Sequence, residues 1–238
     1  MKVKGGKAVY GASVGILMLE AQFPRIPGDM GNATSWPFPV HYKVVRGASP
    51  DRVVRKGAEG LLQTFITAAR ELVDDGVDGV TTNCGFLSLF QEELAAALSV
   101  PVATSSLMQV AMVNRLLAPG RRAGILTISA STLTPAHLKT AGVPDGTPIG
   151  TTEGGREFTR AILGNEIELD VEAARADNID AARALVAAHP DLGALVLECT
   201  NMVPYAADIR AATGLPVFSI ETFVRWFQSA LVPRRFEA

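Results

Sequence analysis

Two stretches of sequence decide the fold: GVTTNCGFLSLFQEELAAALSVPVAT at residues 79–104 and ALVLECTNMVPYAADIRAATGLPVFS at residues 194–219. When the second is laid over the first, Cys84 falls on Cys199 and Pro101 falls on Pro216 at the same offset. In both copies an apolar run ends at the cysteine, a helix-like stretch follows, and a Pro-Val run comes next. The chain is therefore predicted to be a duplication that carries one cysteine at the same place in each copy.

The rest of the chain continues this alternation of strands and helices. Strands are predicted at 14–19, 40–45, 79–82, 101–104, 123–127, 148–150, 194–197 and 217–219. Helical spacing covers 61–73, 88–98, 106–117, 171–188, 205–212 and 220–231, and a short helix opens at 134–135. Because the strands are apolar and largely unalternating, they are expected to lie in parallel sheets buried between helices, which is an α/β fold.

The repeat also predicts how the chain divides. Residues 1–105 together with 221–238 are expected to form one lobe, which carries Cys84, and residues 106–220 a second, which carries Cys199. Ligands of open parallel sheets bind beyond the carboxyl ends of the strands, and each cysteine stands just past such an end. Two lobes that face each other about a pseudo-twofold axis would bring both thiols into one cleft.

Composition and charge exclude several classes of protein. The chain has 238 residues, of which 48% are hydrophobic and 19% charged, as in a packed globular protein. Its formal net charge is −2 and no basic face stands out, so no nucleic-acid partner is expected. No apolar run approaches the roughly 18 residues of a membrane-spanning helix, so no membrane partner is expected either. Two cysteines make no disulfide framework, which predicts reduced thiols in a cytoplasmic compartment.

The sequence offers no metal or nucleotide motif. The three histidines, His41, His137 and His189, lie far apart and lack the spacing of metal ligands, so no metal site is expected. The glycines near the start of the chain form neither a P-loop nor the dinucleotide-binding GxGxxG pattern. The interpretation is chemistry without a cofactor.

A facing pair of thiols suits proton transfer at carbon. One group removes a proton from one face of a carbon and the other returns a proton to the opposite face, which inverts the stereochemistry. A free thiol has a pKa of about 8.5, so the member that acts as base must gain thiolate character. The start of a helix after each cysteine is one source of that stabilisation.

The residues around the cysteines carry a family resemblance. Thr82-Asn83-Cys84-Gly85 and Leu197-Glu198-Cys199-Thr200-Asn201, with the repeat around them, resemble the aspartate/glutamate racemase superfamily of amino-acid racemases, hydantoin racemases, maleate isomerases and arylmalonate decarboxylases. The resemblance implies two flavodoxin-like lobes, each a parallel sheet flanked by helices, with the active site in the cleft. It also implies a homo-oligomer, no metal or organic cofactor, and catalysis by Cys84 and Cys199 as alternating base and acid.

Further residues are candidates for holding a small carboxylate-bearing substrate. Asn83, Thr200 and Asn201 flank the thiols, and Gly85 allows a close approach of main chain to ligand. Gly85 and Phe86 stand where glutamate and aspartate racemases usually have Asn-Thr, which points to another substrate. The loop at 20–39 is long and proline-rich and offers Arg25 for a carboxylate. The resemblance adds three residues after the strand at 123–127: Ser129, Ser131 and Thr132.

The function expected from the sequence is a cofactor-independent racemase of an amino acid, a hydantoin or a related carboxylate. Two alternatives use the same scaffold: cis–trans isomerisation of a maleate-like diacid and decarboxylation of a malonate. An alternative of another class is a protein that binds a small carboxylate without catalysis.

Overall fold

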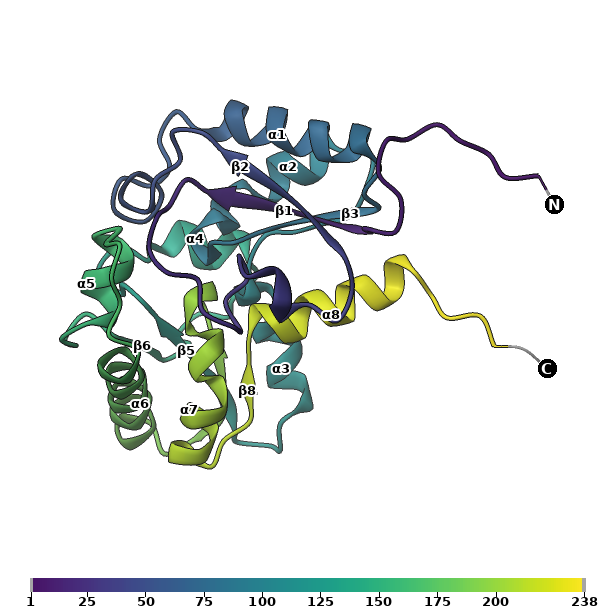
Figure 1. Ribbon diagram of the computed structural model, residues 1–238. Helices are drawn as coiled ribbons and strands as arrows, with labels where there is room; N and C mark the ends of the chain where they lie inside the picture. The colour runs from purple at the N-terminus through teal and green to yellow at the C-terminus, as the bar shows by residue number, and fades with distance from the viewer. Residues whose placement is uncertain (1, 237–238) are drawn as a thin grey trace.

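The structure, a computed structural model, describes residues 2–236 and contains two parallel four-stranded sheets (Figure 1). The first sheet has the order β2-β1-β3-β4 and the second the order β6-β5-β7-β8, so the two share one topology. The strands of the first sheet are β1 (Val14–Leu19), β2 (Val40–Val45), β3 (Gly79–Thr82) and β4 (Val102–Ala103). Those of the second are β5 (Arg122–Thr127), β6 (Ile149–Thr151), β7 (Leu192–Leu197) and β8 (Val217–Phe218). The predicted α/β fold of two similar lobes is confirmed.

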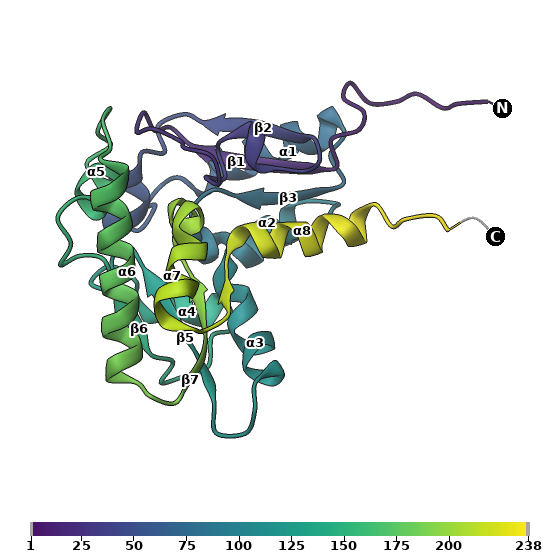
Figure 2. The same cartoon turned by 60° about the horizontal axis from the view of Figure 1, so that its bottom comes forward.

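Helices flank both sheets. The α-helices are α1 (Leu62–Asp75), α2 (Gln91–Ala97), α3 (Val110–Leu116), α4 (Pro135–Thr140), α5 (Phe158–Leu163), α6 (Val171–Ala188), α7 (Ala206–Thr213) and α8 (Ile220–Leu231). Tighter or wider turns form η1 (Ala33–Ser35), the π-helix η2 (Asp51–Arg55), η3 (Gly85–Phe90), η4 (Ser106–Gln109) and η5 (Thr200–Tyr205). Figure 1 shows α1 and α2 over one face of the first sheet, and Figure 2 shows α6 and α7 beside the second.

The central strands are buried because helices cover them on both sides. Every residue of β1 and β3 is buried, and so are the residues of β7 apart from Gly193. This is why their sequences show apolar runs rather than alternation. The predicted helices at 88–98 and 106–117 each begin with a 3₁₀ turn, η3 and η4.

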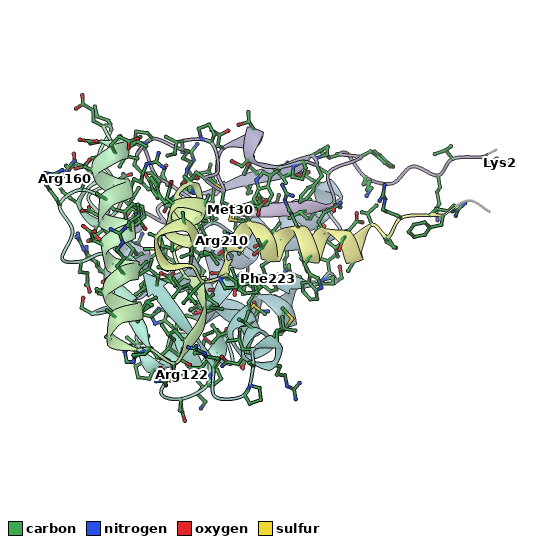
Figure 3. All side chains as sticks on the ribbon, turned by 90° about the horizontal axis from the view of Figure 1, so that it is seen from below. Lys2, Met30, Arg122, Arg160, Arg210 and Phe223 are labelled. Carbon is green, nitrogen blue, oxygen red and sulfur yellow. The ribbon has the colours of Figure 1, made fainter. Side chains whose placement is uncertain are left out.

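The last helix crosses between the lobes. Helix α8 follows β8 of the second sheet, but its apolar residues pack against β1 of the first. Phe223 of α8 and Met30 of the β1–β2 loop, both labelled in Figure 3, belong to this cluster. The exact limits of the lobes, 1–105 plus 221–238 and 106–220, stay a prediction.

None of the helices within residues 2–236 is both long and apolar enough to span a bilayer.

Candidate functional site

The two cysteines occupy equivalent places in the two lobes. Cys84 follows β3 and precedes η3, and Cys199 follows β7 and precedes η5. Both are free thiols, buried, with 8% and 6% of their surface exposed. They line one cavity between the carboxyl ends of the two sheets. The structure therefore brings together the pair that the internal repeat predicts.

This cavity is small and narrow. Its volume of about 20 Å³ is enough for roughly one water molecule. Most of its wall is apolar and comes from the end of β1, the β1–β2 loop, the segment with η2, and α5. The apolar lining residues are Leu19, Phe23, Pro50, Val54, Phe86, Ile128, Ile162 and Leu163. A ligand larger than water requires one of these wall segments to move.

Five of the predicted binding residues line the cavity with the thiols: Asn83, Gly85, Phe86, Thr200 and Asn201. Some of them have polar groups that join parts of the protein. The Asn83 carboxamide oxygen accepts from the Leu19 main-chain N–H at 2.7 Å, and the Thr200 hydroxyl donates to the Asn83 carbonyl at 2.7 Å. These bonds fix the strand ends and tie one lobe to the other. The role of these residues in substrate binding stays a prediction.

The other four predicted binding residues do not line the cavity. Ser129 and Ser131 donate to the Glu153 carboxylate, and Thr132 donates to Ser129. The residue of the β5–α4 loop that lines the cavity is Ile128, which directly follows β5.

Arg25 also lies outside the cavity lining. Its guanidinium forms an ion pair with Asp29 at 2.9 Å and stacks over the Phe23 ring. The other oxygen of Asp29 accepts from the Asn201 side-chain amide at 2.5 Å. Arg25 thus reaches the site through two intermediaries, Phe23 and the Asp29–Asn201 contact, and it orders the β1–β2 loop over the cavity.

Glu198 lines the same cavity and was not among the predicted site residues. Its side chain is fully buried at the end of β7, directly before Cys199. One carboxyl oxygen, Oε2, accepts from the Thr127 hydroxyl at 2.7 Å, while Oε1 has no hydrogen-bond partner among the described residues. Burial raises the pKa of Glu198 to about 7, against the lowering effect of the Thr127 hydroxyl and the Ile128 main-chain N–H. The sequence feature that could have identified Glu198 as a site residue is its charge at the end of an otherwise apolar strand.

The thiols are neutral in this environment. Burial raises the pKa of Cys84 and of Cys199 above the ordinary thiol value, and the nearby charge of Glu198 raises both further. Main-chain N–H groups of Phe86 and Leu87 lower the pKa of Cys84, and that of Asn201 lowers the pKa of Cys199. The amides at the start of each turn are present as expected, but burial outweighs them. A thiolate therefore forms only when a positive charge enters the cavity or a proton acceptor helps.

Replacing Glu198 by glutamine is expected to stabilise the protein at neutral and alkaline pH. The folded pKa of about 7 lies above the ordinary value of 4.5, so the ionised carboxyl disfavours the folded state. The ionised carboxyl does not lower the free energy of unfolding below about pH 4.5. Its destabilising effect grows as the pH rises toward 7 and reaches roughly 3 kcal/mol above about pH 7. Denaturant unfolding at about pH 8 and at about pH 4 would measure it.

The matched control for this prediction is Glu20→Gln. The Glu20 carboxyl also follows a strand, but it is exposed and bound by Arg46 and the Gly47 N–H, which lower its pKa. Its replacement should give no gain at alkaline pH. Equal stability of the wild type and the Glu198→Gln variant at about pH 8 would contradict a buried, costly carboxylate.

Comparison with curated proteins reveals related sequences of one kind. The chain is 30% identical over 227 residues to "Dimethylsulfoniopropionate lyase" of Durusdinium sp. clade D, covering 91% of this chain and 75% of that protein. It is also 30% identical over 230 residues to "Dimethylsulfoniopropionate lyase 7" of Emiliania huxleyi (strain CCMP1516), covering 92% of this chain and 67% of that protein. No protein-family model matches the chain.

Solved structures of low sequence identity share the fold. An arylmalonate decarboxylase superposes with a TM-score of 0.56 at 18% identity, covering 94% of this chain and 95% of that one. A glutamate racemase of Bacillus anthracis gives 0.59 at 15% identity, covering 94% and 85%. The allantoin racemase of Pseudomonas fluorescens gives 0.55 at 17%, covering 94% and 99%. These neighbours confirm the predicted two-lobed fold, which this chain shares with arylmalonate decarboxylase and with glutamate and allantoin racemases.

The predicted activity, in contrast, is wrong. The relatives at 30% identity are named as lyases, which cleave their substrate, and not as racemases or other isomerases. The expected class of isomerase and the expected place in amino-acid metabolism are therefore overturned. The cause is that one fold supports different reactions, so a likeness of fold does not decide which reaction takes place.

Proposed function

The chain belongs to the same family as the dimethylsulfoniopropionate lyases, and on that premise we propose that it cleaves dimethylsulfoniopropionate, or a close analogue, into dimethyl sulfide and acrylate. The observation that carries the proposal is the 30% identity over 91% of the chain. The substrate is a small carboxylate-bearing molecule, as the sequence predicts.

The reaction is an elimination that needs a base. In (CH3)2S+–CH2–CH2–COO− a thiolate takes a proton from the carbon beside the carboxylate. The electrons of that C–H bond form the new double bond, and the C–S bond breaks so that its pair leaves with dimethyl sulfide. The products are dimethyl sulfide, acrylate and a protonated thiol. The step consumes no oxidant or reductant, and a thiol base suffices for it.

The lining of the cavity suits this zwitterion. The apolar wall can surround the two methyl groups of the sulfonium, and an aromatic ring such as that of Phe86 attracts a cation on its face. One face of the Phe23 ring already carries the Arg25 guanidinium. Main-chain N–H groups at the starts of η3 and η5 can hold the carboxylate, as the starts of helices do for anions. Gly85 allows the main chain to approach it closely.

The positive charge of the substrate also explains how a neutral, buried thiol can become a base. A sulfonium next to a buried thiol favours its charged form and lowers its pKa. The base is then produced only when substrate is bound, and an empty site keeps unreactive thiols. The cytoplasmic location and the homo-oligomeric state stay predictions beside this proposal.

The test is direct detection of products. The purified protein is incubated with dimethylsulfoniopropionate, dimethyl sulfide is measured by gas chromatography and acrylate by proton NMR. Release of both in equal amounts supports the proposal. The carbon analogue 4-methylpentanoate, which has the same shape without the positive charge, serves as an unreactive inhibitor and should bind more weakly than the substrate. Absence of both products across a broad pH range would refute the proposed substrate.

A further inference from the structure

Glu198 is a buried group that the elimination step itself does not use. Its carboxyl lies in the wall that it shares with both cysteines, where the two lobes meet. Oε2 is held by Thr127, and Oε1 lies against the main chain of Gly85, the residue after Cys84. A buried carboxyl with one oxygen unpaired costs stability, which a structure tolerates where the group has a task.

An elimination also leaves a proton behind. A racemase returns a proton to its substrate in the second half of the reaction, so its two thiols exchange protonation states. A lyase returns none, because dimethyl sulfide leaves as a neutral molecule and acrylate as an anion. Each turnover therefore leaves one proton on the reacting thiol, and the thiol must lose it before it can act as base again.

We infer that Glu198 takes this proton from the thiol across the cavity that both groups line and releases it toward solvent. Oε1 accepts no hydrogen bond from either thiol in the structure, and the cavity has room for about one water molecule. This inference rests on the proposed function. The thiol and the Glu198 carboxylate become a thiolate and a carboxylic acid, and the acid then ionises as its proton leaves for water. Glu198 does not touch the substrate. It acts through the cysteines and is therefore a positioning residue, which restores the thiolate between turnovers.

The neighbourhood contains few other acceptors. The titratable groups that line the cavity with Glu198 are the thiols of Cys84 and Cys199, which directly precede η3 and η5. On the β1–β2 loop, Asp29 is already engaged by Arg25 and Asn201. On α4, His137 packs edge-on against Phe86, bonds to Thr134, and lies outside the cavity lining. The Cys199 thiol donates to the Asn201 carboxamide oxygen at 3.6 Å, but an amide oxygen does not retain a proton near neutral pH. Among the residues that line the cavity, Glu198 is the one with a carboxyl group.

Hydrogen bonds connect Glu198 to the β5–α4 loop and hold its carboxyl in place, although the main-chain N–H among them does not relay a proton. The Thr127 hydroxyl, which donates to Oε2, accepts from the Ser129 main-chain N–H at 3.3 Å. The Ser129 hydroxyl in turn binds the Glu153 carboxylate at the surface. The predicted site residues of the β5–α4 loop thus find a place on the solvent side of Glu198 rather than in the cavity.

The experiment compares pH profiles of dimethylsulfoniopropionate cleavage by the wild type and by Glu198→Gln. Glutamine keeps the shape and can still accept from Thr127, but it cannot take a proton. The wild-type rate is expected to fall as the pH drops through about 7, because the acceptor must be ionised. The variant should lose roughly 100-fold in kcat with little change in KM, and its remaining rate should rise only at alkaline pH.

A second variant, Thr127→Val, separates a proton-transfer role from a structural one. It removes the hydrogen bond that favours the charged carboxyl, so the pKa of Glu198 should rise. The acidic limb of the profile is then expected to move upward by about one pH unit or more. Glu20→Gln serves as the control and should leave the profile unchanged. A Glu198→Gln enzyme with the rate and profile of the wild type would overturn the inference.

A measurement without substrate keeps this inference distinct from the proposed function. Infrared difference spectra of the wild type against Glu198→Gln detect the carbonyl band of a protonated buried carboxyl. That band should disappear as the pH rises through about 7. If dimethylsulfoniopropionate is not cleaved but the band still titrates near pH 7, the proposed substrate is wrong, while Glu198 is still a buried carboxyl that exchanges its proton near neutral pH. A Glu198 carboxyl that stays protonated at about pH 8 overturns the inference whatever the substrate is, because only the carboxylate can take the proton.

Discussion

Cys84→Ser and Cys199→Ser are each expected to lower kcat/KM for dimethylsulfoniopropionate by at least about 100-fold, and the one that removes the base by about 1,000-fold or more. Serine keeps the size of cysteine, but its hydroxyl does not ionise in a cavity that already disfavours a thiolate. Because an elimination removes a proton and returns none, only one thiol acts as base, and the two losses should be unequal. Rates of acrylate formation measure both.

The control for the cysteine variants is a measurement of their unfolding temperatures, which shows whether each variant is folded. Both side chains are small and buried, so each serine variant should unfold within a few °C of the wild type. Exchange of the substrate's α-proton in D2O adds a second readout, since only the variant that lacks the base should lose exchange entirely. Retention of most of the activity by both variants would show that neither thiol takes the proton.

The repeat made the fold predictable because it is a property of spacing alone. Pro101 and Pro216 follow their cysteines at the same distance, and the structure places β3 and β7 in the same position of their sheets. Parallel strands place their carboxyl ends at one edge, so a residue just after a strand is known to lie at that edge. This reasoning located Cys84, Cys199 and the residues next to them.

The rest of the site depends on contacts that spacing does not encode. Helix α5 supplies Ile162 and Leu163 to the cavity, but it has six residues, too few to show a helical period. The π-helix η2 supplies Val54 to the cavity, and with five residues it too is too short to show a helical period. Glu198 was visible as a charge at the end of an apolar strand, yet only the fold shows that its Oε1 lies unpaired beside Gly85.

The activity was mispredicted because the pair of thiols defines only the first step. Removal of a proton next to a carboxylate is common to racemisation and to elimination. The outcome depends on whether the substrate carries a leaving group, and that is a property of the ligand and of the wall that binds it. An apolar wall around the thiols fits a sulfonium better than the ammonium of an amino acid, which needs hydrogen-bond acceptors.

Gly85→Ala is expected to remove nearly all activity and to destabilise the protein. A methyl group at this position would lie well inside van der Waals contact of the Glu198 side chain and of its main-chain oxygen. A side chain can turn away, but the main chain of Glu198 is fixed by β7 and by its neighbours. Ser106, for example, donates to the Leu197 carbonyl at 2.5 Å. The segment that carries Cys84 must therefore move away from Cys199, and displacements of about 1 Å cost roughly 100-fold in rate.

Gly154→Ala is the matched control for this variant. Gly154 lies in a loop of the second lobe, and a methyl group there would meet no atom within 4 Å. It should leave both the rate and the unfolding temperature unchanged, whereas Gly85→Ala should lower the temperature by several °C and kcat by at least about 100-fold. Folded, fully active Gly85→Ala would mean that the lobes adjust without separating the thiols. In that case the close packing of Gly85 on Glu198 would not set the geometry of the site.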